Sequence, residues 1–168
     1  FMKISVNFFK AKNSSLYAEI NGIKLNSAYD PEKEAERFVE NIKNDFRPSR
    51  IFFLEPCIPY AVHFLNQKFN NIPLTIIRYT HFFDSYNDSK NKTIFFENEN
   101  QFQKELSFFQ EEDFFSSLFI EWPASKNAFP EISEKVHFAI KKQLDFSKTL
   151  LVTRNYFSSR WFKNKINF

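Results

Sequence analysis

Hydrophobic and polar residues alternate at the start of the chain with the period of a β-strand. The alternation covers residues 3–9 and 15–20, on either side of a turn-like segment at 11–14. Asn21-Gly22 then offers a second tight turn before residues 23–25. The first part of the chain therefore predicts a β-hairpin that turns once more into a short apolar segment.

A helix is predicted next, because favourable capping residues mark its start. Asp30 can cap the first turn, Pro31 suits the first helical position, and Glu32 lies near the positive end of the helix dipole. Apolar residues then follow at helical spacing: Ala35, Phe38, Ile42 and Phe46. We expect one amphipathic helix that lasts until Pro48.

Beyond Pro48, short apolar runs alternate with helical patterns. The runs that predict strands are 50–54, 74–79, 93–96 and 117–122. The segments that predict helices are 60–69, 82–86, 100–109 and a long one from 131 to about 161. Such alternation is typical of a mostly parallel sheet covered by helices. We expect an α/β fold, a Rossmann-like three-layer α/β/α sandwich with an N-terminal β-hairpin and a long C-terminal helix.

The predicted elements divide the chain into three regions. Residues 1–26 make the β-hairpin region, 27–130 the Rossmann-like α/β core, and 131–168 a C-terminal helical segment. With 168 residues, 43% of them hydrophobic, the chain can bury one core, and its 25 phenylalanines supply much of the volume.

Charge and cysteine content narrow the function classes. The formal charge of +3 comes from 23 basic and 20 acidic residues, well short of the clustered basic face that nucleic-acid binding needs. The single cysteine, Cys57, rules out an internal disulfide and suits a reducing compartment. No run reaches about 18 apolar residues, the length of a membrane span, and the N-terminus does not resemble a signal peptide. We expect a cytoplasmic protein with no nucleic-acid partner and no membrane span.

The chain contains a single glycine, Gly22. Glycine-rich phosphate loops need residues that tolerate positive φ and let the backbone approach the ligand closely. Neither GxGxxG nor GxxxxGK[ST] can therefore exist here. The classical mononucleotide and dinucleotide loops are excluded, and we predict no bound cofactor.

In a doubly wound sheet a ligand binds at the carboxyl ends of the strands, where the strand order reverses. The first such loop here is Glu-Pro-Cys-Ile-Pro-Tyr, at 55–60, in which the prolines lack amide donors and Glu55 would repel a phosphate. Arg78 and Tyr79 stand where the next strand usually supplies an acidic ribose partner. The loop is either a site rebuilt around Glu55, Tyr60 and Tyr79 or a filled, vestigial cleft. We favour the vestigial cleft.

The sequence does not favour a cysteine nucleophile or a metal site. Cys57 could act as a nucleophile with His63 or His81 as its base, but lone cysteines are commonly small buried hydrophobic residues. The histidines, which include His137, are scattered without the spacing of metal ligands. We predict no catalytic residue and no metal site.

The C-terminal stretch 154–165 combines basic and aromatic residues. Its members are Arg154, Tyr156, Phe157, Arg160, Trp161, Phe162, Lys163 and Lys165. Such a helix can meet RNA or an anionic membrane surface, or it can dock onto a neighbouring domain or a second subunit. We favour the docking helix, because aromatic residues at this density require a partner surface.

Three segments of the chain together resemble one family. LNSAYDPEKEAERF, at 25–38, looks like the S-x-YDP-x-x-EA signature of motility accessory factor (Maf) flagellin glycosyltransferases and their MptE-like relatives, named after 6-hydroxymethylpterin diphosphokinase. The residues that match this signature are Ser27, Tyr29, Asp30, Pro31, Glu34 and Ala35. The segment is fairly specific, and the other two follow it in the order of the family.

The second and third segments match more loosely. Residues 51–65 lie where members carry a hydrophobic strand, a glycine-rich loop and Tyr-His. Tyr60 fits, whereas the glycine positions are occupied by Glu55, Cys57 and Pro59. Residues 148–168 are similar to the helix that leads those proteins into their conserved domain, with matches at Phe157, Trp161 and Asn164.

The resemblance implies a non-catalytic amino-terminal domain that supports a downstream glycosyltransferase domain, which modifies flagellin with a nonulosonic acid. The implied partners are the downstream domain of the same polypeptide, flagellin, and a second copy through the C-terminal helix. Two alternatives stay open. One is a divergent nucleotide- or S-adenosylmethionine-binding enzyme domain with a glycine-free loop, and the other is an RNA- or membrane-surface-binding module that uses the basic aromatic C-terminus.

Overall fold

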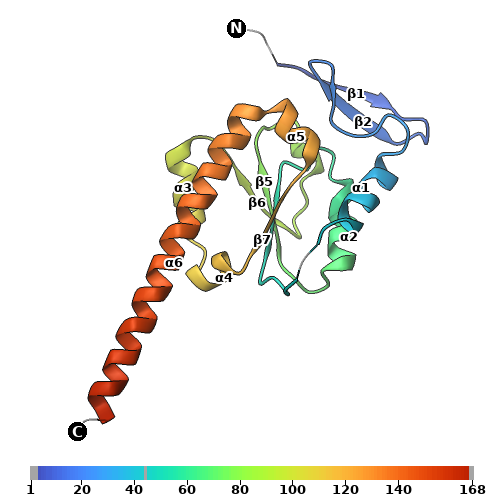
Figure 1. The fold of residues 1–168 in the computed structure, drawn as a ribbon. Coiled ribbons are helices and arrows are strands. Elements are labelled where there is room, and N and C mark those ends of the chain that lie inside the picture. The colour runs from blue at the N-terminus through green and yellow to red at the C-terminus, as the bar shows by residue number, and fades with distance from the viewer. Residues whose placement is uncertain (1–3, 44, 167–168) are drawn as a thin grey trace.

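The computed structural model describes residues 4–43 and 45–166, with side chains as far as Asn155. A four-stranded parallel sheet forms the middle layer, and helices cover both of its faces (Figure 1). A separate three-stranded antiparallel sheet precedes it, and a long helix closes the chain. The predicted α/β fold, with its N-terminal hairpin and long C-terminal helix, is confirmed.

The element order follows the predicted alternation closely. The strands are β1 (Val6–Lys10), β2 (Leu16–Ile20), β3 (Ile23–Lys24), β4 (Ile51–Leu54), β5 (Leu74–Arg78), β6 (Lys92–Phe95) and β7 (Leu118–Glu121). The helices are α1 (Pro31–Glu40), α2 (Tyr60–Lys68), a 3-10 turn (Asp84–Tyr86), α3 (Glu99–Ser107), α4 (Glu111–Phe115), α5 (Pro123–Ala128) and α6 (Pro130–Ile166).

The N-terminal sheet has the order β1-β2-β3 and is antiparallel throughout. Its second turn uses Asn21 and Gly22, both at positive φ (48° and 78°), which is the backbone that the Asn-Gly pair favours. Two side chains of the main body hold this sheet in place. The Tyr60 hydroxyl donates to the carbonyl of Leu16 (2.7 Å), and the Trp122 indole donates to that of Leu25 (2.6 Å).

Helix α1 begins where the sequence predicts. Asp30 has an extended backbone (φ −151°), and its carboxylate accepts a hydrogen bond from the amide of Lys33 at 2.9 Å. Pro31 occupies the first turn, and Glu32 and Glu34 lie near the positive end of the dipole. The predicted cap is confirmed.

The predicted extension of this helix toward Phe46 is wrong, since α1 ends at Glu40 with Asn41 as its C-cap. The Lys68 ammonium, from α2, supplies donors for the carbonyls at this end: Val39 (2.9 Å), Glu40 (3.3 Å) and Ile42 (2.7 Å). A cation at the C-terminus also complements the helix dipole. Ile42 continues the apolar pattern from the following loop, where it packs against the core.

The parallel sheet has the order β6-β5-β4-β7, so β4 and β5 are its central strands. Every residue of β4 and of β5 is buried, as expected for strands covered on both faces. Phe52 of β4 is fully buried among three other rings: Phe109 (5.0 Å between centroids), Phe114 (5.5 Å) and Phe119 (4.9 Å). The chain order reverses between β4 and β7, which makes their carboxyl ends the topological switch point.

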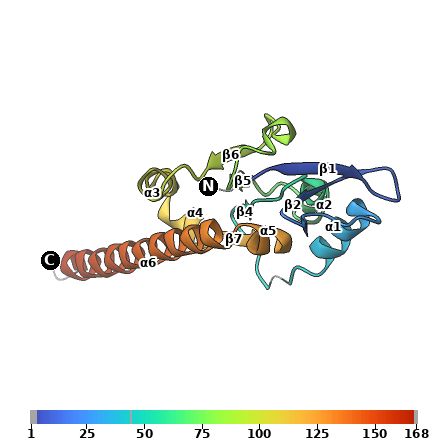
Figure 2. The same ribbon diagram turned by 90° about the horizontal axis from the view of Figure 1, so that it is seen from above.

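The helices fall into two layers. α1 and α2 pack together on one side of the sheet, whereas α3, α4 and α6 pack together on the other (Figures 1 and 2). Helix α6 spans 37 residues, and its C-terminal part projects beyond the body in both views. Among the described residues, no helix combines the length and the apolarity of a membrane span.

Two helices differ from the sequence-based expectation. Helix α4, whose first turn is the acidic run at 111–113, is not among the helices that the sequence predicts. Helix α5 is also missing from the prediction, which has no element between the strand at 117–122 and the helix from 131. Pro123 takes the first position of α5, where its missing amide is not needed. This short helix brings residues 123–130 over the carboxyl ends of β4 and β7.

Candidate functional site

Glu55 and Arg78 form a buried ion pair at the carboxyl edge of the parallel sheet. Glu55 directly follows β4, and Arg78 is the last residue of β5, its neighbour in the sheet. Arg78 Nη1 lies 2.8 Å from Glu55 Oε1, and neither side chain is exposed to solvent. The two residues that the sequence places at the edge of a nucleotide site therefore neutralise each other.

Backbone amides complete the coordination of the Glu55 carboxylate. Oε1 accepts from the amide of Cys57 (3.1 Å), and Oε2 accepts from the amides of Tyr79 (2.7 Å) and Thr80 (3.4 Å). Amides at the ends of parallel strands are the donors that would serve a bound phosphate. In this chain a side-chain carboxylate occupies them, so they are not free for a ligand.

Arg78 is held on several sides. Its Nη1 also donates to the carbonyl of Cys57 (2.9 Å), its Nε donates to Asn87 Oδ1 (2.9 Å), and its guanidinium lies over the ring of Phe83. Nη2 is buried without a hydrogen-bond partner in the described part of the chain. The guanidinium thereby ties the β4 loop to the segment that follows β5.

The loop after β4 has an unusual backbone. Glu55 and Cys57 both have positive φ (32° and 57°), in the left-handed region that favours glycine. Ser125 of α5 helps to hold this conformation, because its hydroxyl donates to the carbonyl of Glu55 at 2.6 Å. The loop thus keeps a backbone suited to glycine although side chains occupy both positions.

Cys57 is a structural residue of this loop. Its thiol is fully buried and lies 3.1 Å from the hydroxyl of Ser125. Burial, with the negative charge of Glu55 as a second cause, raises the pKa of the Cys57 thiol well above its usual value. A protonated, inaccessible thiol is a poor nucleophile.

The histidines considered as bases lie in other surroundings. His63 is on α2, within 3.1 Å of Gln67. His81 lies between two carboxylates, Glu97 (2.7 Å) and Asp84 (3.0 Å), whose hydrogen bonds raise its pKa. No contact in the described part of the chain joins either histidine to Cys57.

The residues proposed for a rebuilt site, Glu55, Tyr60 and Tyr79, are directed toward different surroundings. The Tyr60 hydroxyl is bonded to β2, as described above. The Tyr79 amide binds Glu55, but its hydroxyl donates to the Glu121 carboxylate at the end of β7. Burial, followed by the hydrogen bond to Glu121 and the charge of that residue, raises the pKa of Tyr79.

Glu121 forms the centre of a second polar cluster. Its Oε2 accepts hydrogen bonds from the Tyr79 hydroxyl and from the Ser133 hydroxyl (2.7 Å), and His137 Nε2 lies 3.3 Å away. Only 11% of the Glu121 side chain is exposed, against 52% of His137. This cluster joins β5, β7 and α6 at the switch point of the sheet.

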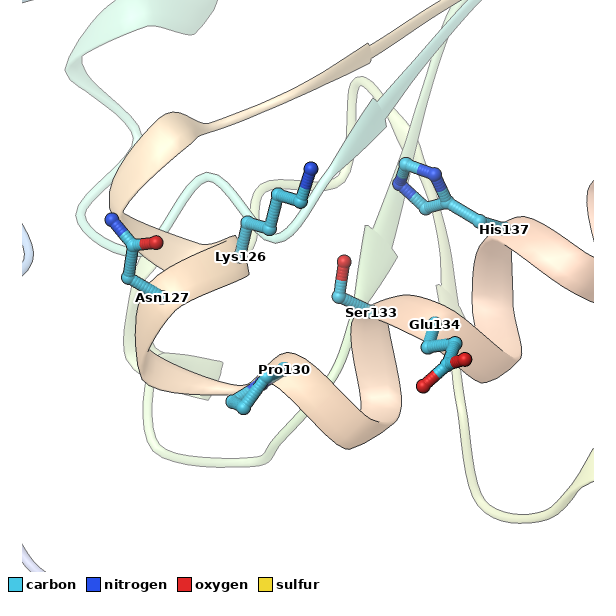
Figure 3. Close-up of a pocket in the computed structure, with 6 residues that line it drawn as sticks. All are labelled: Lys126, Asn127, Pro130, Ser133, Glu134 and His137. Carbon is cyan, nitrogen blue, oxygen red and sulfur yellow. The ribbon is translucent and has the colours of Figure 1, made fainter.

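An open cavity of about 540 Å³ lies beside this cluster, between α5 and α6 (Figure 3). Its lining residues are Lys126, Asn127, Pro130, Ser133, Glu134 and His137. Figure 3 shows Lys126 and Asn127 on α5, and Ser133, Glu134 and His137 on α6. In the described residues no group of three or more His, Cys, Asp or Glu side chains is arranged to hold a metal ion.

Sequence reasoning missed the cluster around Glu121. His137 was noted only as an isolated histidine, and Glu121 and Ser133 were not considered. One signal was available, because Glu121 is an acidic residue at the carboxyl end of an otherwise apolar strand, the position where functional side chains collect.

Removal of one partner of the ion pair should destabilise the domain strongly. Arg78→Met leaves the Glu55 carboxylate buried without its counter-charge, which costs about 3–5 kcal/mol in the free energy of unfolding. The double variant Glu55→Gln/Arg78→Met should recover part of that loss, since the uncompensated charge is gone. The measurement is urea unfolding followed by circular dichroism.

Arg37→Met is the matched control, because Arg37 is exposed on α1. Its effect should stay within about 0.5 kcal/mol. A loss below about 1 kcal/mol for Arg78→Met would mean that the pair contributes little to folding.

Comparison with known proteins identifies no relative of this chain. No family model, no curated protein and no solved structure matches the chain.

Proposed function

We propose that this chain is a non-catalytic amino-terminal domain of a Maf-like (MptE-like) protein, in which it supports a downstream glycosyltransferase domain that modifies flagellin with a nonulosonic acid. The observation that supports the non-catalytic role most strongly is the buried Glu55–Arg78 pair. It occupies the strand-end amides that a nucleotide would use. If its own side chains fill the classical ligand site, the role of the domain lies in its shape and in its contacts with other domains.

The backbone of the loop supports the same interpretation. The family resemblance expects glycines at the positions of Glu55, Cys57 and Pro59. The first two have the left-handed backbone that glycine adopts most readily. This is the conformation expected of a glycine loop that has lost its glycines and acquired an internal ion pair. The filled, vestigial cleft is therefore the interpretation that we prefer for Glu55, Tyr60 and Tyr79.

Helix α6 is the part of the domain best suited to support a neighbour. It is held to the body of the domain by contacts with α3, α4 and α5. Arg154, farther along, pairs with Glu111 of α4 at 3.2 Å. In the proposal, its C-terminal part contacts the downstream domain or a second copy. The side chains from Tyr156 onward, on which the basic aromatic prediction depends, lie outside the described residues.

In this proposal the domain is cytoplasmic. A single unpaired thiol is compatible with that compartment, which is reducing. The competing enzyme hypothesis requires a nucleotide or S-adenosylmethionine to displace Glu55 from its backbone donors. That exchange would leave both Glu55 and Arg78 buried and without their present partners.

Ligands of classical sites should leave the filled edge unperturbed. We expect the amide resonances of Cys57, Tyr79 and Thr80 to stay unchanged when nucleotide sugars, S-adenosylmethionine or a pterin are added, because their protons already point at Glu55. The measurement is a titration followed by ¹H–¹⁵N correlation spectra. Saturable shifts of these three amides would favour the enzyme hypothesis instead.

At position 57, glycine should not cause the loss of stability that it usually causes in a folded chain. Cys57→Gly and Cys57→Ala both remove the thiol, but only the alanine variant keeps a Cβ at positive φ. We expect the glycine variant to be more stable than the alanine variant by about 1 kcal/mol. The measurement is urea unfolding of both variants.

The matched pair Glu36→Gly and Glu36→Ala lies on the exposed face of α1. There the order should be reversed, with glycine about 1 kcal/mol less stable. The same reversed order at position 57 would show that the loop has no glycine-like strain.

A further inference from the structure

We propose that His81 is the centre of a protonation-dependent clasp, which holds the segment after β5 to the chain after β6 while the imidazole ring is charged. The clasp consists of His81, Asp84 and Glu97, and the segment that it holds is 81–87. This segment contains the 3-10 turn, which begins at Asp84. Glu97 lies just beyond the end of β6. The clasp therefore joins two parts of the chain that follow neighbouring strands of the parallel sheet.

Both ring nitrogens of His81 face a carboxylate. Nε2 lies 2.7 Å from Glu97 Oε1, and Nδ1 lies 3.0 Å from Asp84 Oδ2. The imidazole is also stacked on the ring of Phe95, the last residue of β6, with 4.4 Å between the centroids and 14° between the planes. The stacking fixes the plane of the imidazole, and the two carboxylates lie at its opposite edges.

This geometry requires a charged ring. An ionised carboxylate only accepts hydrogen bonds, and a neutral imidazole carries a single N–H. Neutral His81 would therefore direct the lone pair of one nitrogen at a carboxylate oxygen only 2.7 or 3.0 Å away. The imidazolium donates to both carboxylates, so it is the form that the arrangement favours.

The charged neighbours act on the titration of His81 in the same direction. The hydrogen bond to Glu97, followed by the one to Asp84 and by the negative charges of both residues, raises the pKa of His81. These two carboxylates are the charged groups that face the ring from the 3-10 turn and from the chain after β6. Phe95, the contact from β6 itself, carries no charge.

The segment held by the clasp is attached to β5 on its other side. Phe83 is fully buried beneath the guanidinium of Arg78, and Asn87 accepts a hydrogen bond from Arg78 Nε. The backbone hydrogen bonds inside the segment are short-range, such as the one from the Tyr86 amide to the carbonyl of Phe83 (3.0 Å). The clasp adds the attachment to β6, and its loss should loosen the 3-10 turn without unfolding the domain.

The same segment contacts the N-terminal sheet. Phe8 of β1 packs against Phe83 (6.1 Å between centroids) and Tyr86 (6.4 Å). Strand β1 is at the edge of its sheet, whereas the hydrogen bonds from Tyr60 and Trp122 reach β2 and the residue after β3. Opening of the clasp should therefore loosen the β1 side of the sheet and leave the other side attached.

The sign of the pH dependence follows from the raised pKa of His81. A histidine whose pKa is higher in the folded state contributes stability that is fully present below the pKa of the unfolded chain, about 6.5. This contribution is lost as the pH rises through the pKa of the folded state. The clasp should therefore be closed in mildly acidic solution and open in mildly alkaline solution.

The test is an NMR titration of the 168-residue chain from about pH 5.5 to about pH 8.5, a range in which histidine titrates but ordinary carboxylates do not. The imidazole C–H resonance of His81, assigned by its loss in His81→Gln, should titrate with a midpoint above 6.5. Cross-peaks between the rings of Phe8 and Tyr86 should weaken over the same interval.

Hydrogen exchange measures the opening of the segment itself. We compare the exchange rates of the Tyr86 and Asn87 amides with those of an unfolded chain at the same pH, which gives their protection factors. Both protection factors should fall as the pH rises, by at least about threefold in total and by at most about tenfold per pH unit, the limit for one proton.

Variants separate the clasp from a general effect of surface charge. Glu97→Gln and Asp84→Asn each remove one carboxylate, so each should move the His81 midpoint toward 6.5 and reduce the pH dependence of the protection factors. His81→Gln should abolish that dependence. Glu36→Gln removes an exposed carboxylate from α1 and should leave both readouts unchanged.

Three results would overturn the proposal. They are a His81 midpoint at or below 6.5, protection factors that do not change with pH, and the same pH dependence in His81→Gln as in the original chain. The first would show that the ring is not held in its charged form, and the other two that it does not hold the segment. Each would leave the proposed function intact, because that function depends on the Glu55–Arg78 pair.

Discussion

The buried pair of Glu55 and Arg78 determines how the carboxyl edge of this sheet is built. Each charge would be costly to bury alone, and together they satisfy one another and the surrounding backbone. Their geometry fixes the left-handed loop after β4. The carbonyl of Glu55 in that loop accepts a hydrogen bond from the hydroxyl of Ser125. The pair therefore positions α5, and with it the turn into α6, as well as joining two strands.

In many α/β proteins the free strand-end amides and the functional polar side chains lie at the same edge of the sheet, but here they are separated. The strand-end amides between β4 and β5 are used internally, whereas a second cluster of polar side chains lies one strand away, around Glu121. The filled edge supports the non-catalytic role that we propose for the domain.

Much of the fold could be predicted from the sequence, because its signals are local. The Asn21-Gly22 turn, the Asp30 cap and the mostly apolar central strands depend on near neighbours in the chain. The end of α1 could not be predicted, since it depends on Lys68, a cation from the next helix. The same limit applies to the site: Glu55 and Arg78 were each recognised as unusual, but their pairing requires β4 and β5 to be adjacent and in register.

Hydrogen exchange of the Cys57 and Tyr79 amides tests the central claim most directly. Both protons lie outside the strand ladders and are held by one carboxylate, whose place depends on Arg78. If the filled edge is an integral part of the fold, both amides should exchange only through global unfolding, with the same free energy as the core of β4. Exchange as fast as that of the amide of Ser89, an exposed loop residue, would show that the edge opens independently, and would contradict the account.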